Sequence, residues 1–236
     1  MGSSRLGHRW SGDAIGIAEA TIEAGAGAVS QFIHEATVVR HAPTKSNADA
    51  RFMGSLDAPS TADGLADARA LGAKLAIGKD VRLFSSPLQR SIQTMDMLCP
   101  KRDVLIDPRL REWDLGEWEG SFRSDVRAQD PGAFVTTGTL DPLVTPPGGE
   151  SPEQFAQRVA AFLAHISESC AGGKSLIVTH NGVIAVMRAL VETVSLRDAF
   201  EEEEPFLAPR KLAIRTDTLR LGLERVLGEI RSSREP

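Results

Sequence analysis

Three short apolar stretches of the sequence are each followed by polar side chains that suit the binding of an anion. The stretch "ATVV" leads into Arg40 and His41, and "VRLFS" leads into a segment that contains Arg90. The third stretch, "SLIVT", leads into His180. In a mostly parallel sheet, ligands bind beyond the carboxyl ends of the strands, where these residues would meet. Such a cluster is costly unless a negative group joins it, and a phosphoryl group matches the guanidinium fork in bidentate geometry.

His41 is the residue of this group that is best suited to act as a nucleophile. The positive charge of neighbouring arginines lowers the pKa of a histidine and keeps its imidazole neutral, with a lone pair that can attack. Attack on phosphorus would give a phosphohistidine, and the cationic surroundings would stabilise charge on the equatorial oxygens of the transferring group. A single histidine is more often structural, so this hypothesis depends on the whole group, His180 included.

A carboxylic acid is needed to protonate the leaving alcohol, and one segment offers several candidates. The segment "LREWDLGEWEG" contains Trp113 and Trp118, which we expect to pack in the interior rather than to form a substrate platform. The spacing of its carboxylates does not select the catalytic one. The candidates are Glu112, Asp114, Glu117 and Glu119.

The same residues argue against a catalytic metal ion. Arginines would repel a divalent cation, and no carboxylate adjoins either His41 or His180 in sequence to complete a ligand set. The sequence therefore predicts neither a metal nor another cofactor. The remaining histidines are assigned no role, because His8 has no comparable context, His34 is expected to precede the first strand and His165 lies within a predicted helix.

The elements that must position these residues alternate between strand-like and helix-like patterns. This alternation is typical of a sheet with much parallel pairing that is covered by helices. In chain order, the pattern predicts strands at 36–39, 81–85, 103–106 and 175–180, and helices at 62–76, 87–98, 151–170 and 181–192.

Two of the predicted helices carry start signals. Ser151 can cap its helix, Pro152 suits the first helical position, and Gln154 completes a capping box. The same pattern begins at Ser86 and places Arg90 in the first turn of its helix. Helix N-termini present free N–H groups and a partial positive charge, so Arg90 would reinforce a place already suited to an anion.

Composition indicates one globular α/β domain, which we assign to residues 35–236. With 236 residues and 42% hydrophobic composition, the chain can bury a full core. Its 27 basic and 32 acidic residues give a net charge of −5, which predicts no nucleic acid or membrane partner. Cys99 and Cys170 lie far apart in sequence and are predicted to be reduced core thiols rather than a disulfide or zinc ligands.

Two segments are expected to lie apart from this domain. Residues 1–34 are rich in Ala, Gly and Ser and are predicted to form an extension with a short helix near Asp13 to Ala24. Its apolar stretch is interrupted by Glu19 and Glu23, so we expect neither a signal peptide nor a membrane span, and the cytoplasm is the expected location. The acidic run Glu201 to Glu204 is expected to be a solvated loop.

Four motifs in this order resemble those of the histidine phosphatase superfamily, the phosphoglycerate mutase-like proteins. The segment "VVRHAPTKSN" is similar to the family's first arginine and histidine motif, and "SSPLQRSIQT" to its second arginine motif. The segment "LREWDLGEWEG" is similar to its acid loop and "VTHNGVI" to its second histidine motif. The resemblance covers Ala36 to about Glu192 and implies a three-layer α/β/α sandwich around a central, mostly parallel sheet.

The resemblance also implies roles for individual residues. His41 would be the phosphorylated nucleophile, with Arg40 and Arg90 on the phosphate oxygens. His180 would complete this phosphate cradle and stabilise the transferring group.

Three further residues match family positions in the same motifs. Asn47 and Thr44 match positions that help to hold the phosphate, and Glu112 matches the general acid that protonates the leaving group and later activates water. The segments "GSLDAPST" and "PPGGES" look like the family's loops before the first helix and before the long helix.

The sequence departs from the family pattern at two positions next to the nucleophile. Ala42 stands where the family has glycine, and Pro43 stands where it usually has Glu or Gln. The methyl group of Ala42 is tolerable if its backbone dihedrals are ordinary, whereas Pro43 removes an N–H that could face a ligand. These changes bear on substrate preference. The tail after about Thr193 is not explained by the resemblance and is expected to serve oligomerisation or to form a lid.

These observations predict a metal-independent phosphomonoesterase that acts on a small phosphorylated metabolite. Cofactor-dependent mutases of the family have a longer insertion between the acid and the second histidine than the segment from Glu112 to His180 allows, so the resemblance implies a phosphatase. A phosphoglycerate-type mutase stays an alternative, as does a catalytically silent binding protein of the same fold. Arg123 and Arg127 would share one helix face, which we expect to be solvated, although a second acidic group of the substrate could also meet them. A homo-oligomer is compatible with the sequence.

Overall fold

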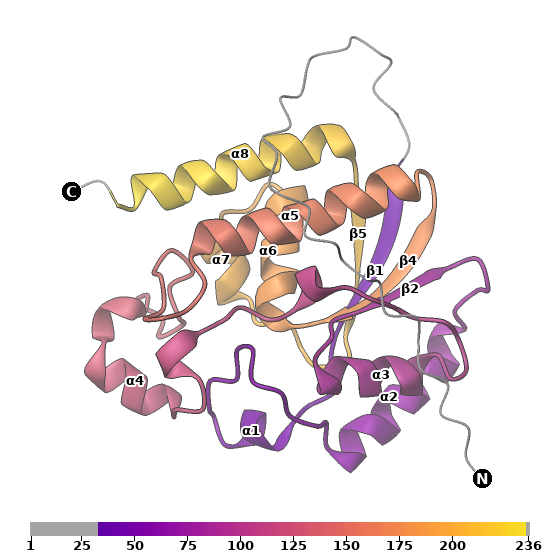
Figure 1. The fold of residues 1–236 in the computed structure, drawn as a ribbon, viewed down its shortest axis with the longest axis horizontal. Helices are drawn as coiled ribbons and strands as arrows, with labels where there is room; N and C mark the ends of the chain where they lie inside the picture. Colours follow the sequence, from indigo (N-terminus) through magenta and orange to yellow (C-terminus); the bar gives the residue numbers. More distant parts are fainter. Residues whose placement is uncertain (1–32, 235–236) are drawn as a thin grey trace. The chain divides into compact units, whose positions relative to one another are not determined.

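The computed structural model describes residues 33–234, shown as the coloured ribbon of Figure 1. The helix predicted near Asp13 to Ala24, and nearly all of the predicted extension, therefore lie outside the described residues. Among the described residues, no helix combines the length and the hydropathy that are needed to cross a bilayer.

A five-stranded sheet lies at the centre of the described domain, as predicted (Figure 1). The strand order is β3-β2-β4-β1-β5, and every neighbouring pair is parallel except β1 with β5. The strands are β1 (His34–Arg40), β2 (Arg82–Ser85), β3 (Leu105–Ile106), β4 (Lys174–Thr179) and β5 (Pro209–Ile214). The mixed α/β fold with a mostly parallel sheet is confirmed.

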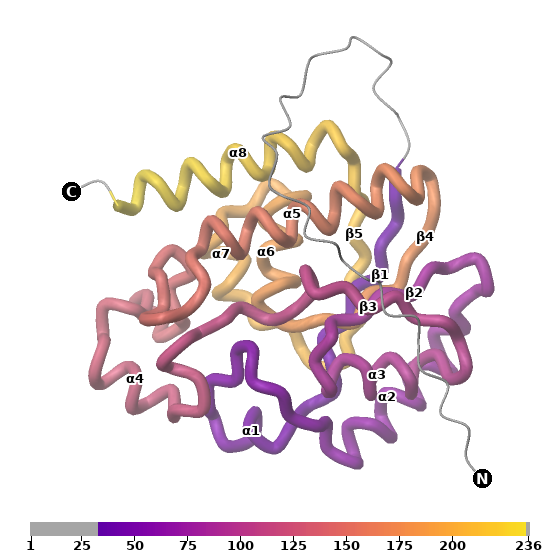
Figure 2. Tube along the Cα trace, in the orientation of Figure 1, coloured from indigo at the N-terminus to yellow at the C-terminus, as the bar shows by residue number. Residues whose placement is uncertain are grey.

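Helices cover both faces of this sheet because strand residues alternate between two hydrophobic cores. Val38 and Ile177 belong to the core beneath α5, α6 and α8, whereas Val39 and Val178 belong to the core beneath α2 and α3. Figure 2 shows α2 and α3 side by side, on the side of the strands away from α5 and α8. The α-helices are α1 (Lys45–Ala48), α2 (Ala62–Leu75), α3 (Gln89–Leu98), α4 (Arg123–Gln129), α5 (Pro152–Ser169), α6 (Asn181–Val191), α7 (Leu196–Glu201) and α8 (Thr216–Ser232).

One predicted helix start is confirmed and the other is wrong. Ser151 and Gln154 form both hydrogen bonds of the capping box at the start of α5. Ser86 does not cap α3, whose N-cap is Leu88 and has no side-chain cap. The hydroxyl group of Ser86 instead accepts from the N–H of Leu88 and lies 2.7 Å from Nε2 of His180. The side chain of Ser86 therefore stabilises the loop that follows β2 and contacts His180.

The segment after Thr193 is an integral part of the domain rather than a lid. Within it, β5 pairs with β1 along the sheet edge, and α8 packs against α5 and α6. A Cβ atom on Gly222 of α8 would lie within van der Waals overlap of the carbonyl oxygen of Leu190, so the two helices cross at backbone contact. The prediction of a lid is therefore wrong for α7, β5 and α8, whereas a role in oligomerisation stays a prediction.

His34 is the first residue of β1 and is fully buried, which corrects the expectation that it precedes the strand. Its Nδ1 lies 3.0 Å from the carbonyl oxygen of Cys170, and its Nε2 lies 3.0 Å from Oγ of Ser175. Burial lowers the pKa of His34. The residue thus ties β1 to the end of α5 and to β4. Cys99 and Cys170 are both free and buried, as predicted.

Candidate active site

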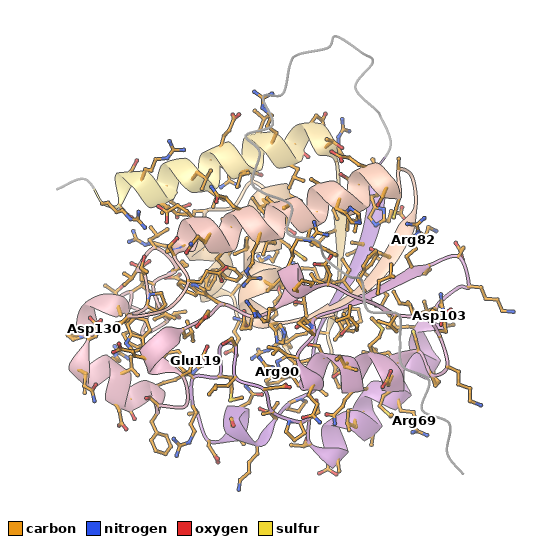
Figure 3. All side chains as sticks on the ribbon, in the orientation of Figure 1. Arg69, Arg82, Arg90, Asp103, Glu119 and Asp130 are labelled. Atoms are coloured by element: carbon orange, nitrogen blue, oxygen red, sulfur yellow. The ribbon has the colours of Figure 1, made fainter. Side chains whose placement is uncertain are left out.

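The carboxyl ends of β1 and β4 bring the first polar residues together. Arg40 is the last residue of β1 and pairs in register with Thr179 of β4, so His41 and His180 follow at the same edge of the sheet. Their imidazole centroids lie 5.1 Å apart. Arg90 reaches this edge from the first turn of α3, in the interior of the domain (Figure 3). The predicted convergence of two arginines and two histidines is therefore what the structure shows.

His41 is held with its Nε2 free of a proton. Its Nδ1 lies 2.7 Å from the carbonyl oxygen of Ala42, and a carbonyl only accepts, so Nδ1 carries the hydrogen. Nε2 then has a lone pair, which accepts from Nε of Arg90 at 3.2 Å. Burial, reinforced by the charges of Arg90 and Arg40, holds the pKa of His41 well below its usual value. The imidazole is consequently neutral, with the lone pair on Nε2 that a nucleophile requires.

His180 is oriented in the complementary way. Its Nε2 donates to Oγ of Ser86 at 2.7 Å and lies 3.3 Å from Oγ of Ser91, while its Nδ1 accepts from Nε of Arg90 at 3.3 Å. Burial, followed by the charges of Arg90 and His41, holds the pKa of His180 well below its usual value. One N–H of Arg90 is therefore shared between the lone pairs of two neutral imidazoles.

Two backbone carbonyls fix the other end of Arg90. Its Nη1 donates to the carbonyl oxygen of Leu56 at 2.7 Å, and its Nη2 donates to that of Gly54 at 2.9 Å. Gly54 has a φ of +47°, and a Cβ atom there would lie 2.2 Å from Oε1 of Glu119. Only glycine fits this position. The segment "GSLDAPST" thus supplies the support that holds Arg90.

Arg40 makes contacts that the sequence did not indicate. Its Nη1 donates to Oε1 of Glu203 at 2.8 Å and to the carbonyl oxygen of Glu204, and its guanidinium carbon lies 3.8 Å from the ring centroid of Phe206. Its Nε is buried and has no hydrogen-bond partner among the described residues. A buried N–H without a partner is costly, so this edge of the guanidinium is suited to an added acceptor such as a phosphate oxygen.

The acidic run is exposed at Glu201, Glu202 and Glu203, as expected, but it also supplies partners to arginines, which was not expected. Glu203 pairs with Arg40, and Glu204 is 3% exposed, with Oε1 at 2.7 Å from Nε of Arg210. Glu202 pairs with Arg188, which is itself buried. Buried arginines require such partners, and that requirement is met from a segment more than a hundred positions away from Arg40 in sequence.

Of the four candidate acids, only Glu112 lines the cavity in front of His41. Its Oε1 accepts from the N–H of Trp113 at 2.9 Å, and its Oε2 accepts from the N–H of Gly182 at 3.1 Å. Glu119 instead accepts from the N–H groups of Ser55 and Leu115, and Asp114 accepts from that of Gly116, so both hold loops together.

Asn47 and Thr44 both follow His41 within a few residues but differ in exposure to the cavity. Asn47 lines the cavity, whereas Thr44 is 1% exposed and does not. The hydroxyl group of Thr44 donates to Oδ1 of Asn47 at 2.8 Å and caps α1. The hydroxyl group of Thr44 is thus committed to orienting Asn47, so any help that Thr44 gives in holding a phosphate would be indirect.

The cavity has a volume of about 280 Å³ and a mixed lining. Beyond the residues above, Arg51 and Arg123 lie at its wall, while Arg127 does not. Trp113 and Trp118 are 2% and 7% exposed, and Trp113 stacks on Phe155 with a centroid distance of 5.5 Å, in agreement with the predicted packing role.

The departures next to the nucleophile are accommodated locally. Ala42 does not have a positive φ, and its N–H donates to Oγ1 of Thr94 at 2.9 Å. The ring of Pro43 covers Gly64 of α2, whose Cβ atom would lie 2.8 Å from Cδ of the proline. The carbonyl oxygen of Pro43 accepts from the N–H of Thr61 at 2.8 Å. Pro43 therefore joins the nucleophile loop to α2.

Arg158 of α5 is a supporting residue that sequence reasoning missed. It donates to the carbonyl oxygens of Arg109, Arg111 and Glu112, at 2.8, 2.7 and 3.1 Å. Its Nε lies 2.6 Å from Oε1 of Glu150, in the "PPGGES" loop. The side chain thus fixes the backbone of the acid loop. Within residues 33–234, no group of three or more His, Cys, Asp or Glu side chains is placed to hold a metal ion.

Comparison with known proteins agrees with this geometry. The family profile described as histidine phosphatase superfamily (branch 1) matches residues 36–205. A 2,3-bisphosphoglycerate-dependent phosphoglycerate mutase of Rhizobium etli is 30% identical over 190 residues, which cover 76% of this chain and 90% of the relative. The resemblance drawn from the four motifs is thus confirmed.

Two solved structures have the same fold. A mycobacterial glucosyl-3-phosphoglycerate phosphatase superposes with a TM-score of 0.68 at 26% identity, over 76% of this chain and 89% of that protein. The protein YhfR of Bacillus stearothermophilus superposes with a TM-score of 0.68 at 29% identity, over 75% of this chain and 90% of that protein. Neighbours of this kind place the chain in a superfamily that contains both mutases and phosphatases.

Proposed function

This chain belongs to the histidine phosphatase superfamily, and we propose that it is a metal-independent phosphomonoesterase that works through a phosphohistidine at His41. One observation carries the proposal. The carbonyl oxygen of Ala42 fixes the proton on Nδ1 of His41, so the lone pair of Nε2 faces the cation of Arg90 at 3.2 Å. A neutral nucleophile beside a fixed positive charge is what phosphoryl transfer to nitrogen requires.

In the first step, Nε2 of His41 attacks phosphorus and the bond from phosphorus to the ester oxygen breaks. Glu112, in its protonated form, gives its proton to the leaving oxygen, so the alcohol departs neutral. Arg90 and the Nε edge of Arg40 stabilise charge on the equatorial oxygens, with Asn47 completing the set. His180 is buried and does not line the cavity, so it acts by orienting Arg90 through the contact of its Nδ1 with Nε of Arg90.

In the second step, the carboxylate of Glu112 takes a proton from water, and the water oxygen attacks phosphorus. The bond between phosphorus and Nε2 of His41 breaks, which restores the neutral imidazole and releases inorganic phosphate. The hydrogen bonds from Trp113 and Gly182 hold the two oxygens of Glu112 in place for both transfers.

Hydrolysis of a chromogenic aryl phosphate tests this proposal, with wild type and His41→Ala compared in the presence of a chelator. We expect turnover by wild type, none above background by His41→Ala, and a phosphorylated His41 in mass spectra of wild type quenched during turnover. Equal activities of the two proteins would refute the catalytic role and favour the silent binding protein. Loss of activity on chelation alone would refute the metal-independent mechanism.

A phosphoglycerate-type mutase is the second candidate, because the relative from Rhizobium etli has that name. This chain covers 90% of that relative, so the short segment from Glu112 to His180 does not separate the two activities. The distinction is whether water or a second substrate hydroxyl accepts the phosphoryl group. Incubation with a phosphorylated sugar acid decides it: we expect inorganic phosphate, and isomer formation without phosphate would establish the mutase.

A further inference from the structure

The acidic run places a carboxylate against Arg40, one of the arginines that line the cavity. Oε1 of Glu203 lies 2.8 Å from Nη1 of Arg40, and both residues line the same cavity as His41. The two side chains differ in environment, because that of Arg40 is 6% exposed and that of Glu203 is 57% exposed. Glu203 is therefore a solvent-facing anion at the edge of a site that must hold another anion.

The backbone around Glu203 is fixed on both sides. On one side, Glu204 is buried, its N–H donates to Oδ1 of Asn181 at 2.8 Å, and its carboxylate pairs with Arg210. On the other side, the ring of Phe206 lies beneath the guanidinium of Arg40. The N–H of Leu207 donates to the carbonyl oxygen of Arg40 at 3.1 Å. The carboxylate of Glu203 is thus held near Arg40 and moves only through its own side-chain rotamers.

The two ends of the Arg40 guanidinium differ in how their donors are used. Its Nη1 serves Glu203 and the carbonyl oxygen of Glu204, while its buried Nε has no partner among the described residues. A phosphate oxygen on the Nε edge would therefore lie one guanidinium width from the carboxylate of Glu203. Two anions at that separation repel, and Glu203 also neutralises part of the charge with which Arg40 attracts phosphate.

Support of Arg40 does not require a carboxylate at this position. The ring of Phe206 and the carbonyl oxygen of Glu204 already hold the guanidinium from two directions. Neither of these groups carries a charge, so they orient Arg40 without opposing an anion. The charge of Glu203 is thus the feature that needs an explanation.

We propose that Glu203 lowers the affinity of this site for inorganic phosphate and so determines how readily the product leaves. This inference rests on the proposed function, in which phosphate is the product. It assigns to Glu203 an effect opposite in sign to that of a residue that merely supports Arg40. Removal of the charge should tighten phosphate binding, whereas removal of a support should loosen it.

Titration calorimetry with inorganic phosphate tests the proposal on wild type, Glu203→Gln and Glu203→Ala. Gln keeps an oxygen that can accept from Arg40 and removes only the charge, whereas Ala removes both. We expect both variants to bind phosphate about 10-fold more tightly than wild type, or more. The phosphate inhibition constant in aryl phosphate hydrolysis should fall by the same factor, without a fall in kcat/KM.

Two matched variants remove one negative charge elsewhere. Glu168→Gln changes an exposed residue of α5 that does not line the cavity, and it should leave phosphate affinity unchanged. Glu201→Gln changes a cavity residue whose hydrogen bond comes from Oγ1 of Thr137 rather than from Arg40, and it should tighten binding by less than Glu203→Gln does. If Glu201→Gln tightens phosphate binding as much as Glu203→Gln does, the assignment to Glu203 is overturned.

The outcomes separate this inference from the proposed function. If wild type binds phosphate and the Glu203 variants bind it equally or more weakly, Glu203 is only a positioning residue for Arg40 and the inference fails. If wild type and every variant fail to bind phosphate and no phosphohistidine forms, the proposed function fails instead.

Discussion

The contact between Gly182 and Glu112 allows a direct test of the general acid. The N–H of Gly182 donates to Oε2 of Glu112, and a Cβ atom on Gly182 would lie 2.6 Å from Oε1. Ordinary van der Waals contact begins at 3.4 Å, so alanine at this position must push the carboxylate away by about 0.8 Å. The glycine is therefore required for the close approach of the acid to the helix start.

We expect Gly182→Ala to lower kcat/KM for an alkyl phosphate by about 100-fold, the usual cost of a displacement near 1 Å at a reacting centre. Activated aryl phosphates have leaving groups that need little protonation, so their hydrolysis should fall by less than about 5-fold. The free energy of unfolding of Gly182→Ala should change by less than about 2 kcal/mol, because overpacking destabilises the protein whereas the better helix propensity of alanine stabilises it.

The assay compares alkyl and aryl phosphate hydrolysis by Gly182→Ala, Glu112→Gln and a control. Gly228→Ala is the matched control, because a Cβ atom on Gly228 of α8 meets nothing within 4 Å. Gly228→Ala should raise the free energy of unfolding by at most about 1 kcal/mol and leave the rates of alkyl and aryl phosphate hydrolysis unchanged. An equal loss for both substrates in Gly182→Ala would refute the reasoning, since displacement of the acid must depend on the leaving group.

Three further predictions concern the histidines, the acid loop and the helix cap. The folded state keeps His41 and His180 neutral, while the unfolded chain takes up protons below its usual pKa of 6.5. Their contribution to stability is therefore present above that pH and is lost as the pH falls below it, by at most about 2.7 kcal/mol for the two histidines between about pH 7.5 and about pH 5.5. Urea unfolding at both pH values measures the loss, and His41→Asn should remove about half of it. Arg158→Met should destabilise the protein by about 3 kcal/mol and lower alkyl phosphate hydrolysis about 10-fold, and an unchanged ratio of alkyl to aryl rates would contradict its role in the acid loop. Thr44→Val should lower the free energy of unfolding by about 1 kcal/mol, as the loss of a helix cap does, and should raise KM far less than Asn47→Ala does. Thermal unfolding and steady-state kinetics measure the two effects. A larger increase in KM for Thr44→Val than for Asn47→Ala would show that the hydroxyl group of Thr44 binds the substrate.

The central residues could be predicted because local sequence features determine their positions. Arg40, His41 and His180 follow strands whose β-branched and apolar residues are evident in the sequence, and parallel pairing brings strand ends to one edge. The helical pattern of the sequence correctly places Arg90 in the first turn of α3, even though Ser86 does not cap that helix. The wrong cap shows that a short polar pattern does not reveal which partner a hydroxyl group takes.

The supporting residues could not be predicted, because their partners come from distant parts of the chain. Arg158 follows no strand and starts no helix, and its three carbonyl partners lie in the acid loop. Composition indicates a solvated segment for Glu203 and Glu204, and only the fold shows that Arg40 and Arg210 lie against them. The sequence offers only a weak signal for these ion pairs. An acidic run can supply the partners that buried arginines require, but the sequence does not show which arginines are buried.

The two arginines of the site differ in how their charge is balanced, and this difference divides their work. Among the described residues, Arg90 forms no salt bridge, and its donors are taken by two carbonyl oxygens and by the lone pairs of His41 and His180. These acceptors are uncharged and hold the orientation of Arg90 without cancelling its charge, although the carboxylates of Glu112, Asp57 and Glu119 lie near enough to act on it. Arg40 has part of its charge balanced by Glu203 and keeps an unpartnered Nε edge. Under the proposed mechanism, Arg90 would act mainly through its charge, whereas Arg40 would supply directed hydrogen bonds whose strength Glu203 would limit.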